Sequence, residues 1–534
     1  MSSEDWSTTS PRWKTMGKIL GITGFLLILF LPDPQTLPPA AQRLAAVTFL
    51  MACLWISQAV SIAATSLIPL ALFPLLGILS AKEVSRAYID ENVILFLGGF
   101  VIALGIEKWG LHRRIALHIV RIIGAGPKQI ILGFMIATGF LSMWISNTAS
   151  SLLMMPIGLA LIRSLHHEDD EDQQGQRRFA LVLMLCIAYS ASIGGFTTLV
   201  GTPTNIQFQK IWSEQFPSTT TTQVPEISAG EWMVAVLPLG IVFLLMAWGL
   251  LTFKLKPFTH SEKLTRGEFT KRLRQLGKPS RAEWLMLILF LSTAALWIFR
   301  KPLTVAGSEL VPGWGGFLAT HLANWGVKES SLHDSTVAMV MAILMFFIPA
   351  SKSTDGRREY LMDWKTAEKL PWEILLLFGG GFALAKGFTA TGLSLWMGKG
   401  FAELAQNWPL WLTVAACCFM LTFLTELTSN VATISAILPV LAGTAIEMQI
   451  DPRLLMIPAT LSASCAFMLP IATPPNAIVF GSGQIRMQDM ARYGLLLNLL
   501  GVIVITLATF ALLVPQLGIS LDGLPSWASL KNIN

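Results

Sequence analysis

Two copies of one polar motif interrupt the apolar stretches of this chain. The first copy pairs Ser146-Asn147 with a later break at Gly201–Asn205, which reads Gly-Thr-Pro-Thr-Asn. The second copy pairs Ser429-Asn430 with Ala472–Asn476, which reads Ala-Thr-Pro-Pro-Asn. Small polar residues and prolines that interrupt membrane helices at corresponding places in two halves of a chain indicate a transporter's binding site.

The side chains of these motifs favour particular ligands. The four segments contain amide and hydroxyl groups but no Arg, Lys or His. Their oxygens, with carbonyls freed where a helix breaks, suit a hard monovalent cation such as Na⁺. Helix N-termini that direct N–H groups at the same place suit an anion. Because an isolated charge inside a membrane is very costly, a dianion and cations bound side by side would neutralise each other. The motifs therefore predict coupled binding of an anion and Na⁺.

Composition places these motifs in a membrane protein. The chain is 53% apolar and 13% charged, with a mean hydropathy of +0.61, which is typical of a polytopic protein in a lipid bilayer. The net charge of +6 is concentrated in a few loops, so it concerns membrane orientation and not nucleic acid. We find no ATP-binding motif and no nucleophile–base set or His/acid cluster at membrane depth, so we expect neither an ATP-driven pump nor an enzyme.

Two pairs of short apolar segments must position the motifs. The segments 129–142 and 149–164 flank Ser146-Asn147, and 408–424 and 432–446 flank Ser429-Asn430. Most are about 14–16 residues long, whereas a membrane span needs about 20. We therefore predict two re-entrant hairpins, at 129–164 and 408–446, whose tips are covered by protein or by a water-filled cavity. Broken helices are predicted at 201–205 and 472–476.

Charge and internal similarity predict an inverted repeat. Lys254–Arg281 holds nine Lys or Arg against two acids and is predicted to be cytoplasmic, whereas Ser213–Glu231 has neither Lys nor Arg and is predicted to be outside. The first hairpin then enters from the cytoplasm and the second from outside. Leu95–Leu111 matches Leu377–Leu393 at nine of seventeen positions with a shift of 282, and the Ser-Asn pairs differ by 283. Opposite entry and a shared shift indicate inverted halves with the site between them.

The expected fold is an all-α polytopic membrane protein with about 11 transmembrane helices and two re-entrant hairpins. We divide it into a cytoplasmic N-terminus with the first helix (1–42), a first repeat (43–253), a basic cytoplasmic loop (254–283), a second repeat (284–515) and a C-terminal tail (516–534). Arg12, Lys14 and Lys18 precede the first apolar stretch and no clear cleavage site follows it. We therefore expect the N-terminus in the cytoplasm and the C-terminus outside, in a bacterial inner membrane.

From about Leu44 to Leu513 the sequence resembles the divalent anion:sodium symporter family. Both hairpin tips, both Pro motifs and the glycine repeat carry the resemblance, and Thr428–Thr433 and Phe467–Phe480 most resemble the Na⁺-coupled di- and tricarboxylate branch. The resemblance implies a homodimeric, elevator-type transporter of the ion-transporter superfamily that imports succinate, malate or fumarate with Na⁺. The alternatives are a Na⁺-independent exchanger of 2-oxoglutarate, malate or citrate, a sulfate-type anion symporter and, in another class, an ion channel.

The resemblance also implies which residues bind the ligands. The first Na⁺ site would use Ser142, Ser146, Asn147 and the carbonyl of Gly201. The second would use Thr425, Thr428, Asn430 and the carbonyl of Ala472. The substrate would contact Ser146, Asn147, Thr148, Thr202, Ser429, Asn430, Thr473 and Pro474.

Three residues of this chain deserve separate expectations. Val431 stands where the family's fuller motif has Thr, which removes a hydroxyl donor, and Thr204 replaces a Pro in the first break. We expect the former to affect substrate preference and the latter to affect helix geometry. Glu426 is an acid at membrane depth, so it either tunes the second cation site or is a buried, hydrogen-bonded structural residue.

Overall fold

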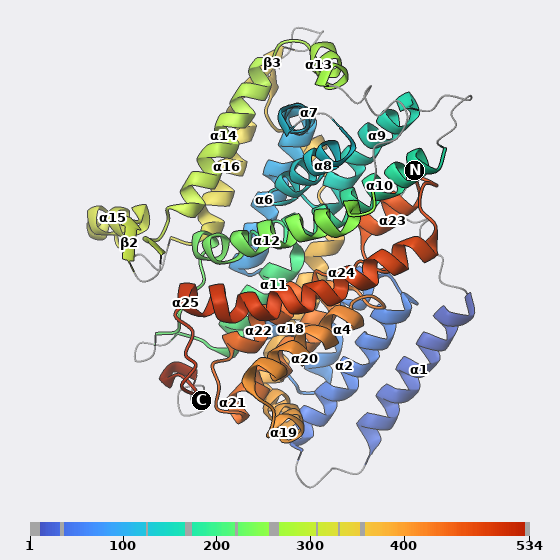
Figure 1. Cartoon of the computed structure of the whole chain (residues 1–534). Coiled ribbons are helices and arrows are strands. Elements are labelled where there is room, and N and C mark those ends of the chain that lie inside the picture. The colour runs from blue at the N-terminus through green and yellow to red at the C-terminus, as the bar shows by residue number, and fades with distance from the viewer. Residues whose placement is uncertain are drawn as a thin grey trace.

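Helices account for almost all of the regular structure of the chain (Figure 1). The computed structural model describes residues 11–31, 37–123, 126–165, 173–218, 223–255, 266–305, 308–328, 332–352 and 358–528. Parts of the predicted N-terminal segment, basic loop and C-terminal tail lie outside these ranges. The first helices are α1 (Pro11–Phe30), α2 (Pro39–Ser57), α3 (Ile62–Thr65), α4 (Ile68–Leu75) and α5 (Ala81–Tyr88).

One series of elements then occurs twice. The first series is α6 (Glu91–Lys108), α7 (Leu111–Ile123), α8 (Pro127–Ser142), α9 (Asn147–Leu165), α10 (Gln173–Gly195), α11 (Pro203–Gln215) and α12 (Ala229–Thr252). The second is α18 (Trp372–Thr391), α19 (Leu393–Ala405), α20 (Leu410–Leu424), α21 (Asn430–Glu447), α22 (Arg453–Ala463), α23 (Pro474–Phe480) and α24 (Met487–Ala508). Helices α12 and α24 lie side by side across the front of the molecule in Figure 1.

Helices and short strands that the sequence pattern predicts less clearly lie between the two series. They are α13 (Arg266–Gln275), α14 (Arg281–Ile298), β1 (Leu303–Val305), β2 (Ser308–Val311), α15 (Trp314–His321), α16 (Asp334–Phe347), β3 (Pro349–Lys352), β4 (Arg358–Tyr360) and α17 (Trp364–Ala367). Strands β1–β2 and β3–β4 form two small antiparallel hairpins that the all-α prediction did not include. They are turns at the ends of α14 and α16 and leave the helical class unchanged.

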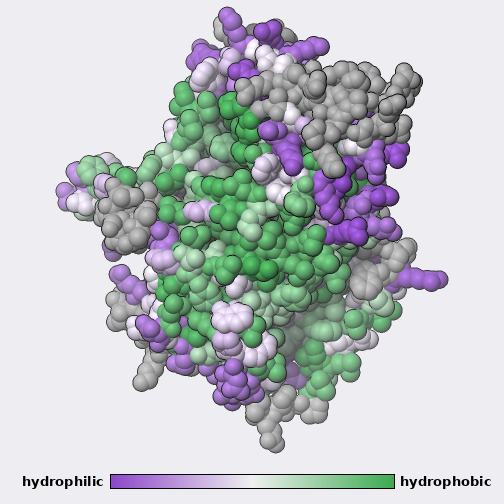
Figure 2. Space-filling view, viewed as in Figure 1, coloured by the Kyte–Doolittle hydropathy of each residue, from purple (hydrophilic) through white to green (hydrophobic). Residues whose placement is uncertain are grey.

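An apolar surface covers the middle of the molecule, and polar side chains gather at its ends (Figure 2). In the described ranges eight helices are long and apolar enough to cross a membrane, or nine if α19 and α20, bent by 120°, form one span. Shorter apolar helices of 10–17 residues include α16 and α22. Helices of this length are shorter than the about 20 residues that a membrane span needs. The chain therefore has more apolar segments than full membrane crossings.

At each predicted hairpin the structure has two helices separated by a short polar break. The break between α8 and α9 is 143–146, and that between α20 and α21 is 425–429. The predicted arm length was wrong for the second arm of each pair, because α9 has 19 residues and α21 has 18. Each of these arms begins at the motif Asn itself, and Ser146 Oγ accepts the amide of Ala149 at 3.2 Å, which caps the first turn of α9.

The two predicted broken helices are also observed. Helix α10 ends at Gly195 and α11 begins at Pro203, whereas α22 ends at Ala463 and α23 begins at Pro474. Thr202 and Thr473 precede these prolines in extended conformation (φ −141° and −140°), because a residue before proline is driven out of the helical region. The pieces cross: α10 packs against α23, and α11 packs against α22.

Candidate functional site

The first hairpin tip folds its polar side chains onto one another. Ser142, the last residue of α8, donates its hydroxyl to Asn147 Oδ1 at 2.5 Å. Ser142 is fully buried, while Ser146, Asn147 and Thr148 are half-buried. The Ser142 oxygen and the Asn147 amide oxygen therefore face each other across the turn, as the two candidate cation ligands of this tip would have to.

The break after α10 is fastened to this tip. Thr198 donates its hydroxyl to the carbonyl of Met143 at 2.5 Å and accepts the amide of Gly201 at 3.1 Å. A Cβ on Gly195 would collide with Asn147 Oδ1, and one on Gly201 would collide with the carbonyls of Gly195 and Ser142. Only glycine permits this close approach of backbone and side-chain oxygens. The structure thus brings together the four residues expected at the first Na⁺ site.

The second hairpin tip is built differently. The hydroxyls of Thr428 and Thr433 form a hydrogen bond of 2.5 Å. Thr425 donates its hydroxyl to the carbonyls of Leu421 and Thr422. Asn430 Oδ1 is buried and has no hydrogen-bond partner within the described part of the chain. A buried acceptor without a donor is costly, so this oxygen has the character expected of a cation ligand. Val431, beside it, is almost fully buried at 7% exposure.

A carboxylate fastens the second break to this tip. Glu426 accepts the amides of Met468 at 2.8 Å and Leu469 at 3.0 Å, and Asn498 of α24 donates to it at 2.7 Å. Asn498 also accepts the amide of Phe467 at 3.2 Å. Among the described residues, Glu426 is therefore hydrogen-bonded to the second break and to α24, as expected of a buried structural carboxylate, and its effect on the second cation site stays a prediction.

The final Asn of each Thr-Pro motif holds its own break in shape. Asn205 donates to the carbonyls of Phe196 and Thr198 at 2.9 and 2.7 Å, and Asn476 donates to those of Ala466 and Leu469, both at 3.0 Å. The sequence motif singled out these asparagines. It did not identify Thr198 or Asn498, because each acts on a segment that is remote from it or belongs to another helix. The signal available for Asn498 was a lone Asn inside the apolar helix α24.

Each hairpin tip, together with the helix break bonded to it, is called a half-site. The two half-sites meet where the broken helices cross. Thr204 and Ser464 share a hydroxyl–hydroxyl bond of 2.9 Å, and α9 packs against α23 as α11 packs against α21. Of the residues expected to contact substrate, Thr202 and Thr473 are buried, Ser429 and Asn430 are half-buried, and Pro474 is exposed. The structure thus places the predicted residues on two adjoining half-sites, with Thr204 in the position of the missing proline linking them.

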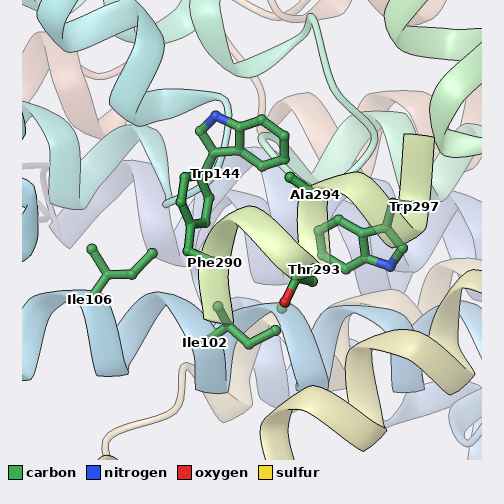
Figure 3. A pocket seen from close by; sticks show the side chains of 8 residues that line it. Ile102, Ile106, Trp144, Phe290, Thr293, Ala294 and Trp297 are labelled. Carbon is green, nitrogen blue, oxygen red and sulfur yellow. The ribbon is translucent and has the colours of Figure 1, made fainter. Parts of the chain in front are cut away.

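An apolar cavity lies beside the first tip, between α6 and α14 (Figure 3). Trp144 meets Phe290 edge-on at 5.1 Å between ring centroids, and Ile102, Thr293 and Trp297 complete much of the lining. A second small cavity reaches Thr198 and Val200. These walls offer almost no polar partner to a dianion, so we do not place the substrate there. Instead, Trp144 packs the first tip against α6 and α14, which lie outside the half-sites.

One buried cation near the first break is neutralised within the protein. Lys210, buried on α11, binds Asp90 at 2.8 Å and Glu214 at 2.7 Å. Among the described residues no group of three or more His, Cys, Asp or Glu side chains could hold a metal ion. Apart from the Glu426 carboxylate, which is hydrogen-bonded to the second break, the oxygens at the tips are hydroxyls, amides and carbonyls, which suit a weakly held monovalent cation better than a divalent metal.

Comparison with known proteins decides the family. The family model described as the sodium:sulfate symporter transmembrane region matches residues 13–515. The chain belongs to the divalent anion:sodium symporter family. Within this family it is 40% identical to the sodium-dependent dicarboxylate transporter SdcS of Staphylococcus saprophyticus over 513 residues, covering 94% of this chain and 92% of the relative. It is 41% identical to the protein of that name from Staphylococcus aureus over 512 residues, covering 95% and 92%.

Two solved transporters share the fold of this symporter-family chain. Neisseria gonorrhoeae MtrF aligns with a TM-score of 0.54 and 12% identity, over 97% of both chains. The Alcanivorax borkumensis YdaH transporter aligns with a TM-score of 0.50 and 13% identity, over 94% of this chain and 99% of the other. At such low identity the likeness concerns the fold alone. It agrees with the expected all-α polytopic transporter architecture.

Proposed function

We propose that this protein is a secondary active transporter that carries C4-dicarboxylates such as succinate, malate or fumarate across the bacterial inner membrane together with Na⁺. The observation that supports it most is the pair of hairpin tips, each hydrogen-bonded to its own helix break. These tips present hydroxyl, amide and carbonyl oxygens without a cationic side chain. The 40–41% identity to sodium-dependent dicarboxylate transporters supports the same substrate class.

In this proposal each tip binds one Na⁺ and the dicarboxylate lies between the tips. The first Na⁺ lies among Ser142, Ser146, Asn147 and Gly201, and the second among Thr425, Thr428, Asn430 and Ala472. The substrate contacts Ser146, Asn147, Thr148, Thr202, Ser429, Asn430, Thr473 and Pro474. With both cations and the dianion bound, the ligands neutralise one another, so the loaded site crosses the membrane at far lower cost than a half-loaded one.

The motion that we propose is an elevator movement in a homodimer. In this proposal the hairpins and broken helices form one mobile unit, which slides against α2–α5 and α14–α16. The edge-on packing of Trp144 against Phe290 lies at this boundary. Such a boundary has to be released and remade in each cycle, and the residues that line the cavity beside Trp144 are mainly apolar and uncharged.

Uptake of labelled succinate into proteoliposomes tests the proposal against its rivals. We expect accumulation when an inward Na⁺ gradient is imposed on vesicles without internal substrate, and little when choline replaces Na⁺. Uptake that needs internal dicarboxylate and ignores Na⁺ would identify an exchanger. Competition by sulfate but not by malate or fumarate would identify a sulfate-type symporter. Conductance without saturable uptake would identify a channel.

A further inference from the structure

The segment that follows the short helix α25 (Val514–Leu517) returns to the body of the molecule. We call residues 518–528 the C-terminal strap. Arg453, the first residue of α22, donates to the carbonyls of Leu517 and Gly518 at 2.8 and 3.0 Å. The amide of Ser520 donates to Asp451 at 3.2 Å. The sequence predicted only a tail here, but the described part of this segment is fastened at its beginning to the N-terminal end of α22.

Asp451 and Arg453 form the anchor of the strap. They are 0% and 3% exposed, and their closest side-chain atoms are 2.6 Å apart. Removal of one partner of a buried ion pair is strongly destabilising, because the other charge is left uncompensated. Here the guanidinium also donates to the carbonyl of Leu517, just before the strap, and to that of Gly518 in the strap. The strap therefore completes the hydrogen bonding of a charge that would otherwise be buried with unpaired N–H groups.

Trp527 joins this anchor to the other helix. Its ring lies 5.3 Å from that of Trp212 and 5.6 Å from that of Phe216, at the C-terminal end of α11. The guanidinium carbon of Arg453 lies 5.5 Å from the same ring. Edge-on aromatic pairs and a cation over a ring each attract beyond simple burial. One side chain of the strap thus contacts the remote ends of both α11 and α22.

The near ends of these two helices are also joined, and those ends reach the half-sites. Thr204, in the first turn of α11, is bonded to Ser464, which follows α22. The first break, with Gly201, runs directly into α11, and the second break, with Ala472, begins where α22 ends. The relative position of α11 and α22 therefore sets the relative position of the two breaks.

We propose that the C-terminal strap is a positioning element for cation binding, in which Trp527 and Arg453 hold the remote ends of α11 and α22 together. With those ends fixed, the carbonyls of Gly201 and Ala472 stay aligned with the hairpin tips. This inference deepens the proposed function and rests on it for its kinetic test. Trp527 and Arg453 are positioning residues, because they touch neither ligand.

The kinetic test uses the full chain in proteoliposomes. Relative to wild type, Trp527→Ala should raise the Na⁺ concentration for half-maximal succinate uptake about fivefold, because it removes two aromatic contacts and one cation–ring contact. The maximal rate at saturating Na⁺ should change less than about twofold. Trp527→Phe, which retains an aromatic ring, should restore most of the Na⁺ affinity. Leu521→Ala, which alters a strap side chain that is 52% exposed, is the matched control and should leave it unchanged.

Hydrogen exchange tests the strap without transport. Amides at the Trp212–Phe216 end of α11 and the Arg453 end of α22 should exchange faster in Trp527→Ala than in Leu521→Ala. If Trp527→Ala does not fold, Trp527→Leu takes its place in both experiments. An unchanged Na⁺ dependence in a folded variant, or unchanged exchange at both helix ends, would overturn the strap's role. A wild type whose uptake ignores Na⁺ would overturn the proposed function, while the exchange result would still decide whether the strap fixes the two helices.

Discussion

At the scale of single residues, the two motif asparagines are equivalent in sequence and unequal in structure. Asn147 Oδ1 accepts the hydroxyl of Ser142, whereas Asn430 Oδ1 is buried and accepts no hydrogen bond from any described residue. The amide oxygen at the second tip therefore gains more from a neighbouring cation. We expect the Na⁺ at the second tip to bind more tightly than the Na⁺ at the first tip.

Replacement of Asn430 and of Asn147 tests the assignment of the two tips. Asn430→Ala should lower Na⁺-driven succinate uptake at least about tenfold, since loss of a partner to a charged group costs about 1.5–3 kcal/mol. Asn147→Ala should have the same direction of effect. The control is Asn407→Ala, an exposed residue between α19 and α20. Full Na⁺-coupled uptake in both site variants, measured in proteoliposomes, would refute the assignment of the two tips.

Glu426 permits a second prediction at this scale. Glu426→Gln exchanges one acceptor oxygen for an amide that faces the backbone donors of Met468 and Leu469. We expect it to lower the free energy of unfolding by about 2–3 kcal/mol, because charge-assisted hydrogen bonds are lost. Thermal unfolding in detergent measures this, with the exposed Glu403→Gln as control. A variant as stable as Glu403→Gln would show that the carboxylate is not what fastens the break.

At the scale of elements, the close approach of break and tip depends on two glycines. Gly195→Ala would drive a methyl group into Asn147 Oδ1, so we expect it to abolish uptake and to destabilise the protein by about 1–3 kcal/mol. Gly249→Ala in α12 is the matched control, because nothing lies within 4 Å of its added Cβ. Gly195→Ala should show much lower uptake and a lower unfolding temperature than Gly249→Ala. Equal behaviour of the two variants would contradict the packing of the first half-site.

The elements that could be predicted are those with a local cause. A Ser-Asn pair between short apolar segments predicts a hairpin, and a Thr-Pro pair predicts a helix break, since proline determines the geometry of its neighbours. The arm lengths were wrong because Asn147 and Asn430 begin their helices instead of remaining in the turn. The Glu426–Asn498 bond joins residues 72 positions apart, and no spacing rule connects such residues. The strap was missed for the same reason.

The loop before α12 and the end of α14 are joined by ion pairs that no sequence pattern predicts. The positive-inside rule treats Arg300 and Lys301 as free charges. In the structure Arg300 binds Asp334 at 2.5 Å and Glu226 at 2.7 Å, and Lys301 binds Glu226 at 3.1 Å. Asp334 and Glu226 lie 34 and 74 positions from Arg300 in sequence, so their neutralising effect follows only from the fold.

At the scale of the whole molecule, Glu226 joins the loop before α12 to the end of α14. Burial raises the pKa of its carboxyl, but Lys301 and Arg300 outweigh that effect and lower the pKa from 4.5 to about 2. A lowered pKa in the folded state stabilises the protein above the unfolded value, and this contribution disappears as pH falls toward the folded value. The ion pairs that join this loop to the end of α14 are therefore expected to weaken only in acid.

The pH dependence of unfolding checks these ion pairs. The difference in melting temperature between wild type and Glu226→Gln should be constant above about pH 5 and should shrink as the pH falls toward about 3. Its size corresponds to less than about 1 kcal/mol, because the Glu226 side chain is 48% exposed and solvent screens the pair. A difference that persists unchanged at about pH 3 would show that the variant acts through something other than this charge.

The central claim is that cation and dicarboxylate share one coupled site, and reciprocal flux tests it most directly. Proteoliposomes with equal Na⁺ on both sides receive an inward succinate gradient, and entry of labelled Na⁺ is followed. We predict that succinate drives Na⁺ accumulation against its own gradient in the wild type and that Asn430→Ala abolishes this accumulation while Asn407→Ala preserves it. Succinate entry without any Na⁺ movement would contradict the account.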